Sequence, residues 1–186
     1  ILINLDSEDE GLLFAGCAGG LDVNVKLEYK DQEPTPEGDI AVRISLTGLR
    51  GGHSGMDIIL GRANANKQLV RFLKEAIASY GARLVHLEGG SARNAIPREA
   101  FALVTIPEAE ADGLWEFASD FLDTLQTEYK NIEDGISLSL ERTDLPKTVI
   151  PEEIQDGVIG ALDACINGVQ SMLTDFPGIV ESSTNM

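Results

Sequence analysis

Basic residues are scarce in this chain of 186 residues: 14 Lys and Arg stand against 31 Asp and Glu, a formal net charge of −17. Nucleic acids and anionic membranes are bound through a basic protein face. The charge therefore argues against both as partners, and the acidity by itself is explained by solubility.

Cysteine and long apolar runs are also lacking. Cys17 and Cys165 are too few for a disulfide framework and have no metal-binding spacing, so a reduced, cytoplasmic setting is expected. Cys165 falls on the apolar face of a predicted helix, which predicts that it is buried and inert. No stretch of about 18 apolar residues is present, so no membrane span is predicted.

Familiar catalytic motifs are missing as well. The chain contains no HExxH, CxxC, Walker or GxGxxG motif, and Ser54 directly after His53 does not form a nucleophile elbow. Because no complete catalytic constellation is visible, the local chemistry favours a binding, dimerisation or lid domain.

The chain is 43% hydrophobic, which is enough for a sizeable core. Alternating apolar residues predict strands, and apolar residues at helical spacing predict helices. The strands are expected at residues 1–5, 12–17, 22–30, 40–46, 83–88, 100–106, 136–140 and 178–186, and the helices at residues 61–80, at 107–130 and from Pro151 to Asn167.

This order of elements predicts an α+β fold: a two-layer sandwich with an antiparallel sheet, helices on one face and ferredoxin-like features. Both ends of the sequence have the pattern of strands, which predicts a domain inserted into a larger protein.

His53 is the first candidate functional residue, because it lies among glycines in Gly51-Gly52-His53-Ser54-Gly55 between a predicted strand and a predicted helix. Glycine allows backbone conformations that bring a chain close to a ligand. The imidazole is thus placed to donate a hydrogen bond outside its own domain; the alternative is a tight turn with a solvated histidine. The other histidine, His86, shares a strand face with Leu84 and is interpreted as structural rather than as a ligand.

Asp6 and Asn94 are two further candidates. Asp6 follows a buried strand directly, where a carboxylate suits a metal ion or merely caps the strand in an acidic turn. Asn94 lies in a loop with glycines and Pro97, where its amide can bind a substrate or serve the backbone in an Asx turn.

Five stretches together resemble one protein family: LINLDSEDEG around Asp6, GCAGG at 16–20, GLRGGHSGMDIILGRANANKQLVRFL at 48–73, GGSARNAIPREAFA at 89–102 and GIVESSTN at 178–185. They are similar to the aminoacyl-histidine dipeptidases, the Xaa-His or carnosinase-like two-zinc metallopeptidases. The resemblance covers nearly the whole chain, and its most specific feature is the His-Gly block together with Asn-Ala-Ile-Pro.

The resemblance implies that residues 1–19 and 179–186 are strands of a catalytic domain, and that residues 20–178 form a lid domain inserted in it. Asp6 then corresponds to a zinc ligand, His53 to the lid histidine that reaches the substrate carbonyl, and Asn94 to the lid asparagine that holds the substrate. The implied full-length enzyme binds two Zn²⁺ and hydrolyses Xaa-His dipeptides such as β-alanyl-histidine. Its partners are a dipeptide and the catalytic domain, and a homodimer remains open.

The sequence departs from that family in two ways. The other metal ligands and the glutamate base are not found, and one carboxylate cannot hold a catalytic zinc, so this stretch alone is expected to be inactive and to bind no zinc tightly. Ser171 stands near where an arginine for the substrate carboxylate is expected. Two alternatives therefore remain: a domain used only for dimerisation, and the lid of a related amidohydrolase or aminoacylase.

Overall fold

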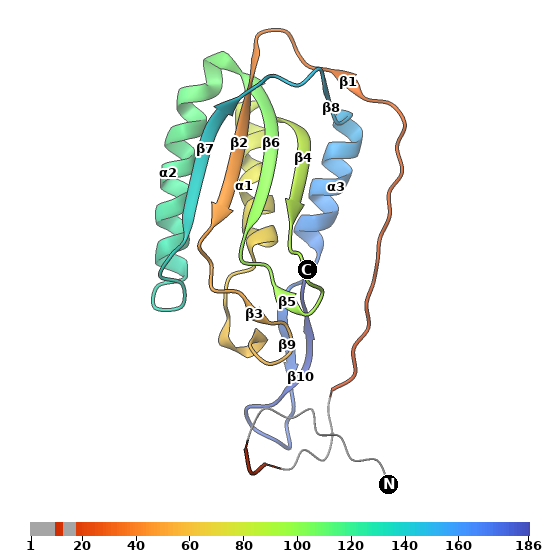
Figure 1. Cartoon of the computed structure of the whole chain (residues 1–186), viewed down its shortest axis with the longest axis vertical. Coiled ribbons are helices and arrows are strands. Elements are labelled where there is room, and N and C mark those ends of the chain that lie inside the picture. The colour runs from red at the N-terminus through yellow and green to blue at the C-terminus, as the bar shows by residue number, and fades with distance from the viewer. Residues whose placement is uncertain (1–9, 13–17) are drawn as a thin grey trace.

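The computed structural model describes residues 10–12 and 18–186, which are drawn as ribbon in Figure 1. Asp6 and the strands expected at 1–5 and 12–17 lie outside these residues, apart from Leu12. Within the described part, no helix is both long and apolar enough to cross a membrane.

A four-stranded antiparallel sheet forms the centre of the fold, in the order β4-β6-β2-β7. Val42 of β2 lies opposite Val104 of β6 and Arg142 of β7, which sets the register. Apolar residues at every second position of β2 are buried, so one face of the sheet builds the core. The strands are β2 (Asp39–Thr47), β4 (Arg83–Gly89), β6 (Ala100–Pro107) and β7 (Ser137–Thr143).

Three helices cover that face, with α1 (Ala65–Tyr80) between α2 (Ala111–Glu128) and α3 (Glu152–Ala164) (Figure 1). The N-terminus of α1 is capped by Asn64, whose side chain accepts from the Lys67 N–H at 3.2 Å. Gly81 ends the helix in a left-handed conformation, with φ 65°. Stacked aromatic rings join α1 to α2, with the Phe72 and Phe117 centroids 5.0 Å apart.

Short two-stranded pairings surround the sheet. They are β1 (Glu33–Pro34) with β8 (Thr148–Val149), β3 (Gly52–His53) with β5 (Ala95–Ile96), and β9 (Gly168–Met172) with β10 (Val180–Thr184). Two 3₁₀ turns, η1 (Ile58–Leu60) and η2 (Glu108–Glu110), complete the described elements. The pairing of β3 with β5 brings two loops together below the sheet (Figure 1).

The predicted fold class is confirmed: β2-α1-β4-β6-α2-β7 is the βαββαβ order of ferredoxin-like domains, with all three helices on one face. Several details were wrong. Residues 22–30 form no strand, and the first helix begins at Ala65 rather than at 61. The third helix ends at Ala164 rather than at Asn167, Cys165 beyond it is exposed, and the strand β9 was not predicted.

Candidate functional site

Two of the predicted site residues meet at one end of the sheet. β2 leads into β3, and β5 leads into β6, so the antiparallel β3–β5 pair places His53 opposite Ala95. The Ser54 N–H donates to the Asn94 carbonyl at 2.9 Å and extends this pairing by one residue. The structure therefore brings the main chains of the two loops together, with His53 paired to Ala95 and Asn94 bonded to Ser54, and both His53 and Asn94 are exposed.

The imidazole of His53 is oriented by its own turn. Its Nδ1 accepts hydrogen bonds from the N–H groups of Gly55 at 3.0 Å and Met56 at 3.1 Å. A nitrogen that accepts hydrogen bonds carries no proton, so the neutral ring has its proton on Nε2. The exposed ring thus presents an N–H donor at its far edge.

The main chain around His53 is fixed by a carboxylate and a guanidinium. The Asp57 carboxylate accepts from the His53 N–H at 2.8 Å, and Arg62 Nη1 lies 3.4 Å from the same oxygen. Arg62 also donates to the Gly51 carbonyl at 2.6 Å. Gly52 has φ 138°, and a Cβ there would lie 2.3 Å from Arg62 Nη1, so only glycine fits beneath this pair.

A third stretch of the chain joins the site through asparagine side chains. Asn185 donates from Nδ2 to the Ala95 carbonyl at 2.9 Å, and the buried Asn64 donates to the Met186 carbonyl and to Asn167 Oδ1, both at 2.8 Å. Residue 185 belongs to the stretch 178–185 that resembles the dipeptidase family, but the sequence analysis assigned it no role. The one property that could have pointed to it is that an asparagine amide both donates and accepts hydrogen bonds.

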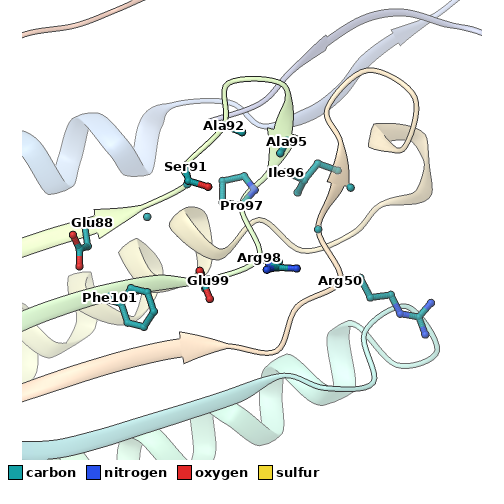
Figure 2. Close-up of a pocket in the computed structure, with 14 residues that line it drawn as sticks. Arg50, Glu88, Ser91, Ala92, Ala95, Ile96, Pro97, Arg98, Glu99 and Phe101 are labelled. Atoms are coloured by element: carbon teal, nitrogen blue, oxygen red, sulfur yellow. The ribbon is translucent and has the colours of Figure 1, made fainter.

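A cavity of about 550 Å³ lies beside the β3–β5 pair. Arg50 and Arg98 are among the residues that line it (Figure 2), and Arg50 also pairs with Asp134. His53 and Asn94 do not line this cavity, so the cavity is not assigned as their binding site.

The described residues contain no group of three or more His, Cys, Asp or Glu side chains that could hold a metal ion. Asp6 lies outside the described residues. His86 is exposed on β4 with its Nε2 3.3 Å from Glu88 Oε2. The prediction that it shares a strand face with Leu84 was wrong, because a register shift between Leu84 and His86 leaves Leu84 buried and His86 in solvent. Ser171 lies on β9, where its hydroxyl is 2.5 Å from that of Ser182 on β10.

The geometry can be compared with known proteins. Residues 44–133 match a family model described as the peptidase dimerisation domain. The chain is 39% identical over its full length to the cytosol non-specific dipeptidase of Escherichia coli, of which it covers 38%. It also resembles the crystal structure of aminoacylhistidine dipeptidase from Vibrio alginolyticus, with 42% identity and a TM-score of 0.81 over 83% of this chain and 32% of that one.

The match to this family model begins within β2 and ends in the turn after α2, so it takes in most of the βαββαβ unit. The chain as a whole is similar to one region of two dipeptidases, one of them an aminoacylhistidine dipeptidase. It spans less than two fifths of the length of the curated relative.

Proposed function

We propose that residues 20–178 are the lid of a zinc-dependent dipeptidase that hydrolyses Xaa-His dipeptides such as β-alanyl-histidine, with residues 1–19 and 179–186 as catalytic-domain strands. The observation that carries the proposal is the exposed His53 ring, whose Nδ1 accepts from two main-chain N–H groups and whose Nε2 is left as a donor. The similarity to two dipeptidases supports the substrate class.

The role of His53 follows from that tautomer. A peptide carbonyl oxygen gains negative charge as the bond is attacked, and a donor placed in advance stabilises this charge. Asn94 is held beside it, and its amide is suited to the polar groups of a bound dipeptide. Closure of a lid would bring both residues to the reacting bond and exclude water.

In this proposal the two Zn²⁺ are held by Asp6 together with residues outside this chain, which would supply the other metal ligands and the glutamate base. Asp6 is proposed as the one ligand that this chain contributes. The chain alone should therefore show no turnover of β-alanyl-histidine when zinc is added, and measurable turnover would contradict this division of roles.

The decisive experiment uses the complete protein encoded by the reading frame around these residues. His53→Ala should lower kcat by about 10²–10³-fold, the typical loss for one oxyanion donor, with the molecular mass unchanged. His86→Ala, which removes the exposed histidine of β4, is the matched control and should keep kcat. Retained turnover in His53→Ala, or a reading frame without metal ligands on either side, would overturn the proposal.

A second function, dimerisation, is favoured by the description of the family that residues 44–133 match. The proposed partner is a second copy of the chain. Light scattering should give the mass of a dimer for the complete protein; a monomer at micromolar concentration would remove this function. The cytosolic description of the Escherichia coli relative supports a cytoplasmic location.

A further inference from the structure

A buried carboxylate lies next to the candidate site without being part of it. Glu133 follows α2, where its N–H donates to the Tyr129 carbonyl at 3.0 Å, and the residue is only 5% exposed. Burying an ionised carboxylate is costly unless hydrogen bonds compensate for the lost water. The groups that donate hydrogen bonds to the Glu133 carboxylate therefore indicate its role.

Both partners are main-chain N–H groups. Oε2 accepts from the Arg50 N–H at 2.7 Å, and Oε1 accepts from the Ala63 N–H at 3.0 Å. The Arg50 side chain pairs instead with the neighbouring, exposed Asp134. Arg50 and Ala63 are the two ends of the loop 51–62 that contains His53, so one carboxylate joins both ends of that loop.

The loop between these ends is bonded within itself. The Asp57 carboxylate accepts from the His53 N–H, and Arg62 donates to the Gly51 carbonyl. The Asp57 N–H in turn donates to the His53 carbonyl at 2.9 Å. A loop tied in this way moves as a unit, and its two attached ends then determine where the imidazole lies.

We propose that Glu133 is a positioning residue for His53: its carboxylate fixes both ends of the 51–62 loop and so places the imidazole against the Asn94 segment. This inference rests on the proposed function only for its catalytic consequence. The structural part concerns the chain itself and is tested without turnover.

The first test is amide hydrogen exchange in this chain. The reporter is the Ser54 N–H, which donates to the Asn94 carbonyl. Glu133→Gln replaces one acceptor oxygen by an NH₂ group, so the Ser54 amide should exchange about tenfold faster or more. Asp134→Asn is the matched control at the next, exposed carboxylate and should change that rate less than about twofold. An unchanged Ser54 rate, with effects at Arg50 and Ala63 alone, would overturn the proposal.

The second test is a double-mutant cycle on turnover by the complete protein. Glu133→Gln should lower kcat by about 10–10²-fold with KM nearly unchanged, because a small displacement of a catalytic group has effects of this size. Combined with His53→Ala it should cause almost no further loss, since Glu133 acts through His53. An equal loss in both backgrounds would mean a general structural role and would refute the inference.

If Glu133→Gln does not fold, the variant Glu133→Asp, which has a shorter side chain, tests the same proposal. Glu133→Asp keeps the charge but cannot reach both ends of the loop, so the Ser54 exchange rate should rise and kcat should fall. Wild-type values for both would contradict the proposal. If His53→Ala alone keeps wild-type turnover, the proposed function fails, whereas the exchange result still decides whether Glu133 positions the loop.

Discussion

Residues 22–30 and β2 (Asp39–Thr47) have the same alternating pattern but different structures. In β2 the apolar positions are buried, and Ile44 is 0% exposed. In the earlier stretch the corresponding residues lie in solvent, and Val25 is 89% exposed. β2 has a hydrogen-bonded neighbour on each side, whereas no described strand pairs with residues 22–30.

The difference teaches that alternation specifies which face of a strand is apolar, but not whether a neighbouring strand is present. The earlier stretch is attached at its start by Asp22 with Arg93 at 2.9 Å, and three residues beyond its end by Glu33 of β1 with Arg83. Its middle forms an exposed ion pair of its own, Lys26 with Glu28 at 2.6 Å. A strand thus requires both an alternating sequence and a neighbouring strand to which it can form hydrogen bonds.

The largest expected contrast is in amide hydrogen exchange. Amides at 40–46 should exchange only through global unfolding, because β2 is central in the sheet, while those at 22–30 should exchange through local opening that costs almost nothing. With a typical stability of about 5–15 kcal/mol, the two rates should differ by three orders of magnitude or more. Similar protection in both stretches would mean that residues 22–30 pair with a strand in solution.

Truncation of side chains should give the next contrast. Ile44→Ala leaves a cavity in the core and should lower the free energy of unfolding by about 2–5 kcal/mol. Val25→Ala removes an exposed side chain and should change it by less than about 0.5 kcal/mol. Urea denaturation of both variants tests this. A loss above about 1 kcal/mol for Val25→Ala would show that this face is covered in solution.

The sheet and its helices could be predicted because their signals are local. Asn64 and Gly81 bound α1, and apolar residues at every second position mark β2. His53 and Asn94 were singled out through their motifs, but the pairing of their two loops was not predicted, because it depends on a contact between distant parts of the chain. Their proposed roles in binding and catalysis remain predictions.

Other parts of the site could not be predicted, because they depend on hydrogen bonds between distant residues. Glu133 lies in a turn, where a carboxylate is normally solvated. The N–H groups that bind its buried carboxylate lie 70 and 83 residues earlier in the chain. Asn185 bonds to Ala95 across 90 residues. Asp57 looks like an ordinary acidic residue until the turn places its carboxylate against the His53 N–H.

The smallest effect is expected at Glu33, where the exposed stretch joins the sheet. The hydrogen bond from Arg83 lowers the pKa of the Glu33 carboxyl below its ordinary value. Because the folded pKa lies below the unfolded one, the pair stabilises the fold above the unfolded pKa, and this contribution is lost as the pH falls through the folded pKa. Stability measured below about pH 5 should therefore fall less steeply in Glu33→Gln than in the wild type. Glu37→Gln, which removes an exposed carboxylate that forms no ion pair with a described residue, is the control and should keep the wild-type slope. If Glu33→Gln also keeps that slope, the junction contributes nothing to stability, and the stretch at 22–30 is even less firmly attached than its ion pairs indicate.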